Sequence, residues 1–468
     1  MYASKQLTIS TTPYLSQYNH LWLRLLPLNL TVILFFVQAW IDIGGTTVRS
    51  EDVLTLLLFI FLYLLPTITK RVGNSPSISV ALNRSLIFWC LLIMFGIILT
   101  LFENSFGTAT KKDAVVEGFR LILACTLFWS ILHHPAPPIK KFQMLVSSVF
   151  LFSFITTSVA IMQIGYWDGW LPFSLPSVLT SFKEGANTDL GREIFALYLG
   201  NTGTHTWSGM LALQALIVWI IAWERGIKKA RWVFLGYFVI LVLILIRTSV
   251  RNSILGLFIT LVFILLASVT YRQSIPVRLI RVIGATSFIA ILGTTFLILA
   301  PRESYYVQRI LQALPQWENG NILISRQSNI FGRLEYGEIA WRIFESSPLL
   351  GRGFSSFQEL SISYFKVPVV HAHNAYLHTL AELGLVGFIG LLLLIYQVAR
   401  FLVATRHYSQ APQPYQGAWK LTFGTFIFLL FTSFFSNTLL FSVYFGFFMV
   451  LLALLVNLSR HSSQQHEP

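Results

Sequence analysis

Residues 371–399 read HAHNAYLHTLAELGLVGFIGLLLLIYQVA and join a polar segment to a long apolar run. From residue 374 onward the run can cross a hydrocarbon core about 30 Å thick, for which a helix needs about 20 residues. Two imidazoles and an amide at the mouth of a membrane span are costly to hold in lipid. The polar start of this stretch therefore indicates chemistry at the membrane surface.

The rest of the chain is apolar in the same way. Hydrophobic residues make up 55% of the 468 and charged residues 11%, against averages of about 45–50% and 25% in soluble domains. We expect an all-α fold, a polytopic integral membrane bundle of about 12 transmembrane helices that forms a single domain over residues 1–468. The predicted spans are residues 25–42, 53–69, 85–102, 115–132, 143–163, 207–223, 232–247, 252–270, 280–300, 374–399, 420–436 and 438–458.

The distribution of basic residues predicts how the bundle lies in the membrane. Cytoplasmic loops collect Lys and Arg, and a count over the short loops places both termini in the cytoplasm. Two long loops, residues 164–206 and 301–373, then lie on the extracytoplasmic face. The stretch before residue 25 is too long and too polar for the start of a cleavable signal, so the first span is expected to be permanent.

Charge and cysteine usage exclude several classes of protein. The net charge is +14, but most of the excess falls at cytoplasmic ends of spans, where anionic lipid accounts for it. Membrane lipid is therefore an expected partner and nucleic acid is not. Cys90 and Cys125 each lie inside an apolar span, so neither a disulfide framework nor a thiolate metal site is indicated.

The second long loop contains an amphipathic helix over residues 333–345, which we expect to lie along the bilayer surface or to cap the bundle. It is predicted to end at Ser346-Ser347-Pro348, because proline cannot continue the hydrogen-bond ladder. Gly351 and Gly353 then permit a tight turn. One helical face carries Glu335, Glu338, Arg342 and Glu345, and the apolar Leu334, Ile339, Trp341 and Phe344 lie largely elsewhere.

Several short motifs around this loop follow a fixed order. They are Gly332-Arg333, Trp341, Pro348-Leu-Leu-Gly351, Gly353-Phe354 and His373-Asn374-x9-Gly384-x-x-Gly387. Together they are similar to the signature region of bacterial O-antigen ligases and O-antigen or exopolysaccharide polymerases, and the resemblance is strongest over residues 240–400. Phe388-Ile389 after the second glycine and Gly200-Asn201-Thr202-Gly203 in the first long loop depart from the family pattern, which leaves ligase or polymerase open.

The resemblance implies a glycosyltransferase of lipopolysaccharide or exopolysaccharide biosynthesis in the bacterial cytoplasmic (inner) membrane. Its donor would be a glycan on undecaprenyl diphosphate, and its acceptor would be a hydroxyl of a glycan or of a lipid-linked glycan. The site would face the extracytoplasmic side, and neither a metal nor a cofactor is expected. The reaction would be a direct displacement that inverts the anomeric carbon.

Such a transfer needs a base for the acceptor hydroxyl and fixed positive charge for the departing diphosphate. His373 matches the histidine of the family motif and is assigned as the base, because an imidazole has an ordinary pKa of about 6.5. Arg251 at the edge of a span and Arg333 in the second loop match the family's arginines. They are assigned to the diphosphate, which guanidinium groups bind bidentately. Arg247 and His371 are supporting candidates.

Other polar residues near the motif have two interpretations. Asn374 either holds the imidazole tautomer or caps the following helix. Glu382 lies inside a span, where an ionisable group is functional by default, either as a clamp to a neighbouring helix or in catalysis. His378 is interpreted as packing or as a partner of a site residue. The glycines at every third position from Gly384 to Gly390 most simply let a second helix approach closely.

Three other functions remain open at this point. A metal-dependent glycosyltransferase would need grouped acidic ligands in the outer loops, but the chain has no aspartate after Asp189. A multi-span transporter of a small anion or solute would bury charged or broken helix segments near the bilayer midplane, whereas the polar positions here cluster at the outer edge. A structural membrane scaffold would tolerate replacement of the arginines and the histidine.

Overall fold

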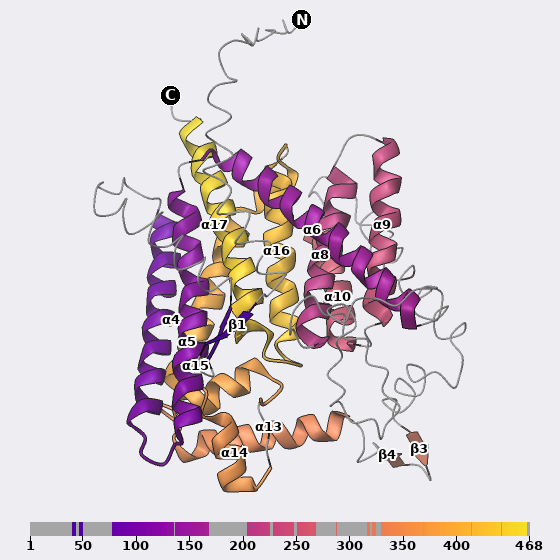
Figure 1. The fold of residues 1–468 in the computed structure, drawn as a ribbon. Helices are drawn as coiled ribbons and strands as arrows, with labels where there is room; N and C mark the ends of the chain where they lie inside the picture. Colours follow the sequence, from indigo (N-terminus) through magenta and orange to yellow (C-terminus); the bar gives the residue numbers. More distant parts are fainter. Residues whose placement is uncertain are drawn as a thin grey trace, which may run out of the picture.

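The structure of the protein is a computed structural model dominated by helices (Figure 1). It describes residues 40–43, 46–49, 77–134, 136–167, 204–224, 228–247, 250–267, 287, 316–318, 321–323, 329–367, 369, 371–412, 414–440 and 442–465. Within these residues the strands form two short antiparallel hairpins, β1 (Trp40–Ile43) with β2 (Thr46–Arg49) and β3 (Gln316–Glu318) with β4 (Asn321–Leu323). The predicted helical class therefore holds for the described residues apart from these hairpins.

The helices account for nearly all other described residues. They are α4 (Ser77–Phe102), α5 (Thr108–His133), α6 (Pro138–Trp167), α8 (Thr204–Glu224), α9 (Lys228–Arg247), α10 (Arg251–Ala267), α13 (Asn329–Ser346), α14 (Phe357–Phe365), α15 (Ala375–Ala404), α16 (Tyr415–Thr432) and α17 (Ser442–Gln465). Two 3₁₀ turns, η3 (Arg406–Gln410) and η4 (Thr438–Leu440), lie between the last three. Most of the long helices stand side by side, and α6 crosses them obliquely (Figure 1).

Two of the long helices, α15 and α16, run in opposite directions. The N–H of Ala375 donates to the carbonyl of Ser433 (2.9 Å), which joins the start of α15 to the end of α16. At the other end the indole N–H of Trp419 donates to the carbonyl of Leu402 (3.0 Å), so α15 and α16 are antiparallel. We call the end of the bundle at which α15 begins the motif end; it lies at the bottom of Figure 1.

Other helices begin at the motif end too. The hydroxyl of Ser208 lies 3.0 Å from that of Ser253, which joins the starts of α8 and α10. Gly209 of α8 packs against Tyr444 near the start of α17. The polar loops that carry the sequence motifs therefore meet one end of the bundle.

The sides of the bundle differ in burial. Almost every side chain is buried from Ser208 to Ala222 in α8 and from Tyr444 to Leu458 in α17. By contrast α4 exposes Ile87, Leu91 and Ile98 along one face, and α6 exposes Leu151 and Phe154. Continuous exposed apolar faces of this kind are unfavourable in water and are typical of helices that contact lipid.

The described residues contain five helices that are long and apolar enough to cross a membrane, and three shorter apolar helices. The five are Val80–Phe102, Thr108–His133, Pro138–Met162, Ala375–Ala404 and Tyr444–Ser462, and the three are Ser208–Ala222, Arg231–Ile246 and Asn252–Ala267. The predicted spans 53–69 and 280–300 lie outside the described residues, apart from residue 287, and so does most of 25–42. The total of twelve spans therefore stays a prediction.

Two predicted boundaries need correction. Residues 40–42, placed at the end of the first span, belong to β1. The eleventh and twelfth spans were expected to be separated by a single residue, but α16 ends at Thr432 and α17 begins at Ser442. The longer turn has its own hydrogen bonds, including one from the N–H of Leu439 to the hydroxyl of Ser433 (3.0 Å). A purely apolar sequence does not show where such a turn begins.

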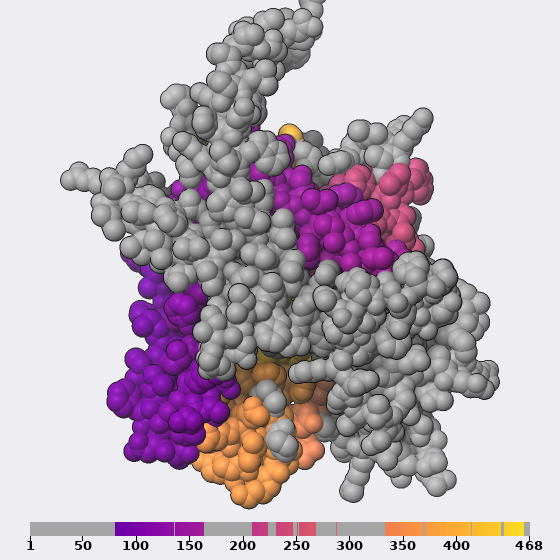
Figure 2. Space-filling model, viewed as in Figure 1, coloured from indigo at the N-terminus to yellow at the C-terminus, as the bar shows by residue number. Residues whose placement is uncertain are grey.

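The predicted amphipathic helix exists as α13 and ends at Ser346, as expected from Pro348. It runs across the motif end, close to α14 (Figure 1), and Figure 2 shows the surface of this region in orange beside α4 and α5 in indigo. Ile339 and Ile343 are buried in a small hydrophobic cluster with Phe357 of α14. The expected apolar side is only partly buried, because Trp341 is 48% exposed.

Candidate functional site

The motif Gly384-x-x-Gly387 marks a break in α15. Gly384 has φ 63° and ψ −165°, a conformation that glycine adopts at little cost. The N–H groups of Leu385 and Val386 donate outside the helix, to the carbonyl oxygens of Pro348 and Leu349 at 2.8 and 3.1 Å. The break is thus filled by the loop that follows α13, residues 348–354, which we call the clamp loop.

The clamp loop also satisfies carbonyl groups on the other side of the break. The N–H of Gly353 donates to the carbonyl of Glu382 (2.8 Å), and the N–H of Arg352 donates to that of Ala381 (3.4 Å). Gly351 and Gly353 have φ values of 72° and 103°, which confirms the predicted tight turn. A Cβ on Gly351 would lie 2.2 Å from the carbonyl oxygen of Glu382, so the approach requires glycine.

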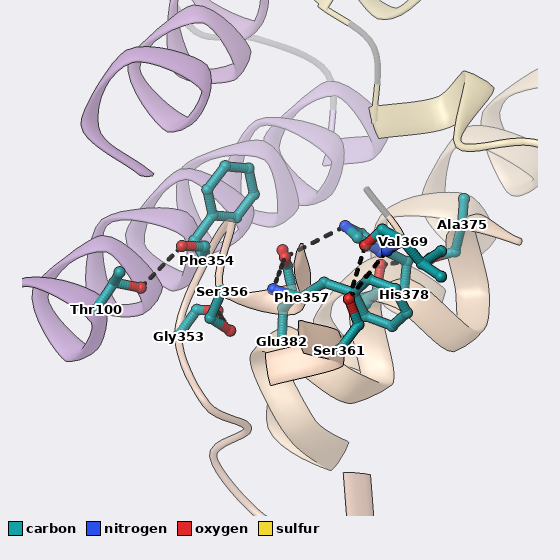
Figure 3. A network of polar contacts seen from close by, with 11 residues as sticks. Thr100, Gly353, Phe354, Ser356, Phe357, Ser361, Val369, Ala375, His378 and Glu382 are labelled. Carbon is teal, nitrogen blue, oxygen red and sulfur yellow. Dashed lines mark hydrogen bonds and ion pairs between the residues drawn. The ribbon is translucent and has the colours of Figure 1, made fainter. Parts of the chain in front are cut away.

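On its far side the clamp loop is bonded to α4. The N–H of Phe354 donates to the carbonyl of Gly96 (3.0 Å), and the hydroxyl of Thr100 donates to the carbonyl of Phe354 (2.8 Å; Figure 3). The motif Pro348-Leu-Leu-Gly351-x-Gly353-Phe354 therefore fixes one loop between two helices.

Two of the three glycines of α15, Gly384 and Gly390, have different roles. Gly390 packs against Leu92 of α4, so the expected close approach of a second helix is confirmed there. It is wrong for Gly384, whose close neighbours are backbone atoms of Leu349 and Gly351 in the clamp loop. The three-residue spacing of the glycines is typical of helix packing, whereas the positive φ of Gly384 shows that the helix is broken there.

Asn374 is the N-cap of α15. Its side-chain oxygen accepts hydrogen bonds from the N–H groups of Tyr376 and Leu377, both at 3.0 Å. These donors have no partner inside a helix, and Asn is among the best residues for binding them. Of the two interpretations from sequence, capping is the one that the structure shows.

His373 and Arg333 come together at the motif end. The imidazole of His373 stacks on the ring of Tyr336 with centroids 5.5 Å apart, and Tyr336 lies one turn after Arg333 on α13. Burial lowers the pKa of His373 below its ordinary value, and the positive charge of Arg333 and the nearby His378 lower it further. A neutral imidazole is therefore favoured beside a fixed guanidinium charge.

His371 lies deeper than His373. Burial lowers its pKa to about 4, His378 also lowers it, and Glu382 opposes the shift. The rings of His371 and His378 meet edge to face with centroids 5.8 Å apart. His371 is consequently neutral at ordinary pH and belongs to the same group of side chains.

Glu382 and His378 form a buried pair one turn apart on α15. The Glu382 carboxylate accepts from the N–H of Phe357 (3.2 Å) and lies 3.3 Å from Nε2 of His378 (Figure 3). The ring of His378 also packs on that of Phe357, with centroids 5.0 Å apart. Glu382 is thus a clamp to a neighbouring helix, and that helix is α14.

Arg251 and Arg247 lie where α10 begins and α9 ends. Their side chains lie outside the described part of the structure, so their contacts stay a prediction. The start of α10 is at the motif end, because Gly256 packs against Thr432 and the next residue, Ser433, accepts from Ala375. Arg251 is therefore placed at the same end of the bundle as His373.

The described residues contain no group of three or more His, Cys, Asp or Glu side chains that could hold a metal ion. The described part of the site offers a guanidinium group and imidazoles to a ligand. Such groups bind anions directly and exchange protons.

Two site residues were missed by the sequence analysis. Tyr336 could have been found, because it lies three residues after Arg333 and shares its helical face. Ser361 gave no signal. Its hydroxyl donates to the carbonyl of Val369 (3.0 Å) and accepts from its N–H (3.2 Å), which fixes the chain as it returns from α14 to His371.

Comparison with known proteins adds one match. Residues 236–392 match the sequence profile of the family described as O-antigen ligase, and no curated protein matches the chain. The matched segment includes Arg251, Arg333, the clamp loop, His373 and the break at Gly384. By this match and by its motifs, the segment of residues 236–392 is similar to the O-antigen ligase family.

Proposed function

We propose that the protein is a membrane glycan transferase, an O-antigen ligase or polysaccharide polymerase. It moves a saccharide from an undecaprenyl-diphosphate carrier to an acceptor hydroxyl. One observation carries this proposal: α13 and the start of α15 bring Arg333 and His373 together at one end of an apolar bundle, close enough for the guanidinium charge to act on the imidazole. The O-antigen ligase match over residues 236–392 supports the reaction class.

In the proposed reaction His373 takes the proton of the acceptor hydroxyl. The hydroxyl oxygen forms a bond to the anomeric carbon on the face opposite the diphosphate. The bond from that carbon to the diphosphate oxygen breaks, and its electron pair stays on the diphosphate. Arg333 and Arg251 bind the diphosphate as its charge grows. The lowered pKa keeps His373 unprotonated and ready to act as a base near pH 7.

The length of α15 supports a site at the membrane surface. The residues from Leu385 to Ala404 extend about 30 Å as a helix, which matches a hydrocarbon core. Gly384 then lies at the edge of that core, and His373 lies beyond it. A diphosphate whose lipid tail is buried in the same leaflet would lie at this level, because its charge cannot enter hydrocarbon.

The break in α15 also favours a second candidate, a transporter, because carriers use broken helices to bind substrates. Two features weigh against it. The break lies near one end of α15 rather than at its middle, and the clamp loop already bonds the backbone groups of Leu385, Val386, Ala381 and Glu382. Uptake of a small anion into proteoliposomes, without glycan transfer, would favour the transporter.

The deciding experiment is complementation of a deletion strain, followed by electrophoresis of surface glycans. We expect His373→Ala to lose about 10²- to 10⁴-fold in transfer while the protein remains inserted. Arg333→Lys should also be damaging, because lysine lacks the bidentate guanidinium. His407→Ala and Arg342→Ala are the matched controls: His407 is exposed at the far end, and Arg342 pairs with Glu338 on the exposed side of α13.

The product pattern separates the candidate reactions. Single repeat units in the deletion strain indicate a lost polymerase, and free carrier-linked chains indicate a lost ligase. An unchanged ladder in the deletion strain, or full transfer by His373→Ala, would contradict the proposal. Purified protein that transfers glycan equally well with excess chelator would support the metal-independent mechanism.

A further inference from the structure

The proposed reaction makes no use of the buried pair Glu382 and His378. Glu382 is 3% exposed and His378 is 7% exposed, although both belong to residue types that carry charge. Burying a carboxylate is costly unless hydrogen bonds and an opposite charge compensate it. Because this buried pair lies close to His371 and His373, we expect it to have a role in the site.

The contacts of Glu382 connect three segments of the motif end. Its side chain accepts from the N–H of Phe357 at the start of α14, where the helix dipole favours negative charge. Its backbone carbonyl accepts from Gly353 of the clamp loop. The same carboxylate faces Nε2 of His378 at 3.3 Å, a contact that favours one orientation of the ring.

His378 in turn meets the loop that carries the proposed base. Its ring lies edge to face with His371. The groups that act on His371 are His378, Glu382 and His373. Those that act on His373 are Arg333 and His378, and Tyr336 stacks on its ring.

We propose that Glu382 and His378 are positioning residues of the transfer site. The carboxylate orients the His378 imidazole and the start of α14, and the pair sets the protonation of the histidines at 371 and 373. This inference rests on the proposed function for its meaning, but its central test does not require transfer. Neither residue touches the substrate in this scheme.

The signs of the effects can be worked out in advance. Glu382 raises the pKa of His371, so Glu382→Gln should lower the pH at which His371 becomes protonated. His378 lowers the pKa of both His371 and His373. His378→Phe should therefore raise the pH midpoint at which each of these two histidines becomes protonated. Phenylalanine keeps a ring to pack against Phe357. A role limited to packing would move neither midpoint.

The test is the rate of histidine modification by diethyl pyrocarbonate across a pH series, resolved by mass spectrometry on the full chain in lipid nanodiscs. Glu359→Gln is the matched control, because Glu359 also accepts a backbone N–H, from Gly107 at 2.8 Å, and lies on α14. We expect opposite shifts for the two variants and none for the control. Unmoved midpoints in both Glu382→Gln and His378→Phe would overturn the inference.

Transfer assays complete the test. Glu382→Gln should lower transfer by about 10- to 100-fold, the loss found when hydrogen-bonded partners of functional histidines are removed at metal sites. His378→Phe should move the acid limb of the pH profile upward with His373. If the wild-type protein transfers no glycan but the variants shift the protonation midpoints as expected, only the proposed function is contradicted. If the wild-type protein transfers glycan but neither variant shifts the protonation midpoints, only this inference is contradicted.

Discussion

His373 combines three features that rarely coincide in one residue. Its φ is 51°, which is unfavourable for a side chain with a Cβ and costs about 1–2 kcal/mol. Its ring is held against Tyr336, and its pKa is lowered. Strained conformations persist where the surrounding contacts determine them and where function uses them. The next residue, Asn374, is itself fixed by the hydrogen bonds of its cap.

The lowered pKa of His373 predicts the pH dependence of transfer. Protonation removes the base, so transfer falls as the pH falls through the pKa, and the acid limb should lie below pH 6.5, the ordinary histidine value. Arg333→Gln removes a positive charge, so the pKa should rise and the limb should move to higher pH. Arg333→Lys keeps the charge and should keep the limb. Rates at low donor concentration from pH 5 to 8 measure this, and an unmoved limb in Arg333→Gln would contradict it.

Asn374 is expected to contribute to stability through its cap. Asn374→Ala should lower the free energy of unfolding by about 1 kcal/mol, because two N–H groups of α15 lose their acceptor. Asn374→Asp keeps an acceptor at the positive end of the helix dipole and should cost much less. Thermal unfolding of the three proteins in one detergent checks the order. Equal losses for alanine and aspartate would show that the cap is not the source.

Among the elements, the clamp loop explains how the apolar helix α15 can be broken at Gly384. Backbone groups without partners cost several kcal/mol each in hydrocarbon. Here the N–H groups of Leu385 and Val386 and the carbonyls of Ala381 and Glu382 all bond to the loop. The loop and the break therefore depend on each other, and they hold the first part of α15, with its buried pair, against α14.

Gly384 should be the glycine that tolerates substitution least. A Cβ there would lie 2.4 Å from the N of Gly351 and 2.5 Å from the carbonyl oxygen of Leu349, and its φ is positive. We expect Gly384→Ala to destabilise the protein by more than about 2 kcal/mol. In Gly337→Ala the new methyl group meets Leu377 at 3.5 Å and should be neutral or stabilising. Unfolding at the same temperature in both variants would refute the role of the break.

The sequence predicted some of these elements and not others, for physical reasons. The end of α13 and the tight turn follow from local chemistry, because Pro348 stops a helix and glycines permit positive φ. The break in α15 does not, because the apolar pattern continues through Gly384 and the partners of the break lie 29 to 37 residues earlier in the chain. Tyr336 shares the helical face of Arg333, so the sequence could have indicated it, but its stacking on His373 depends on the fold.

In the molecule as a whole, the sequence motifs lie together at one end of the bundle. Arg84, Lys140, Arg400 and Lys420 lie at helix ends away from the motif end, where the basic residues of cytoplasmic loops are expected. The histidine loop, the clamp loop and the starts of α10 and α15 lie at the other. A donor whose diphosphate faces outward can reach this site only if the motif end is extracytoplasmic.

Cysteine labelling tests that orientation. Cys90 and Cys125 are replaced by alanine, and single cysteines are placed at Gln358 on α14 and at Gln410 in η3, both exposed and at opposite ends. A membrane-impermeant maleimide applied to intact spheroplasts should label Gln358→Cys at once and Gln410→Cys only after the membrane is opened, because the bilayer blocks a charged reagent. The reverse pattern would place His373 on the cytoplasmic side, where a lipid diphosphate that faces outward cannot reach it. It would therefore exclude the proposed reaction on the extracytoplasmic face.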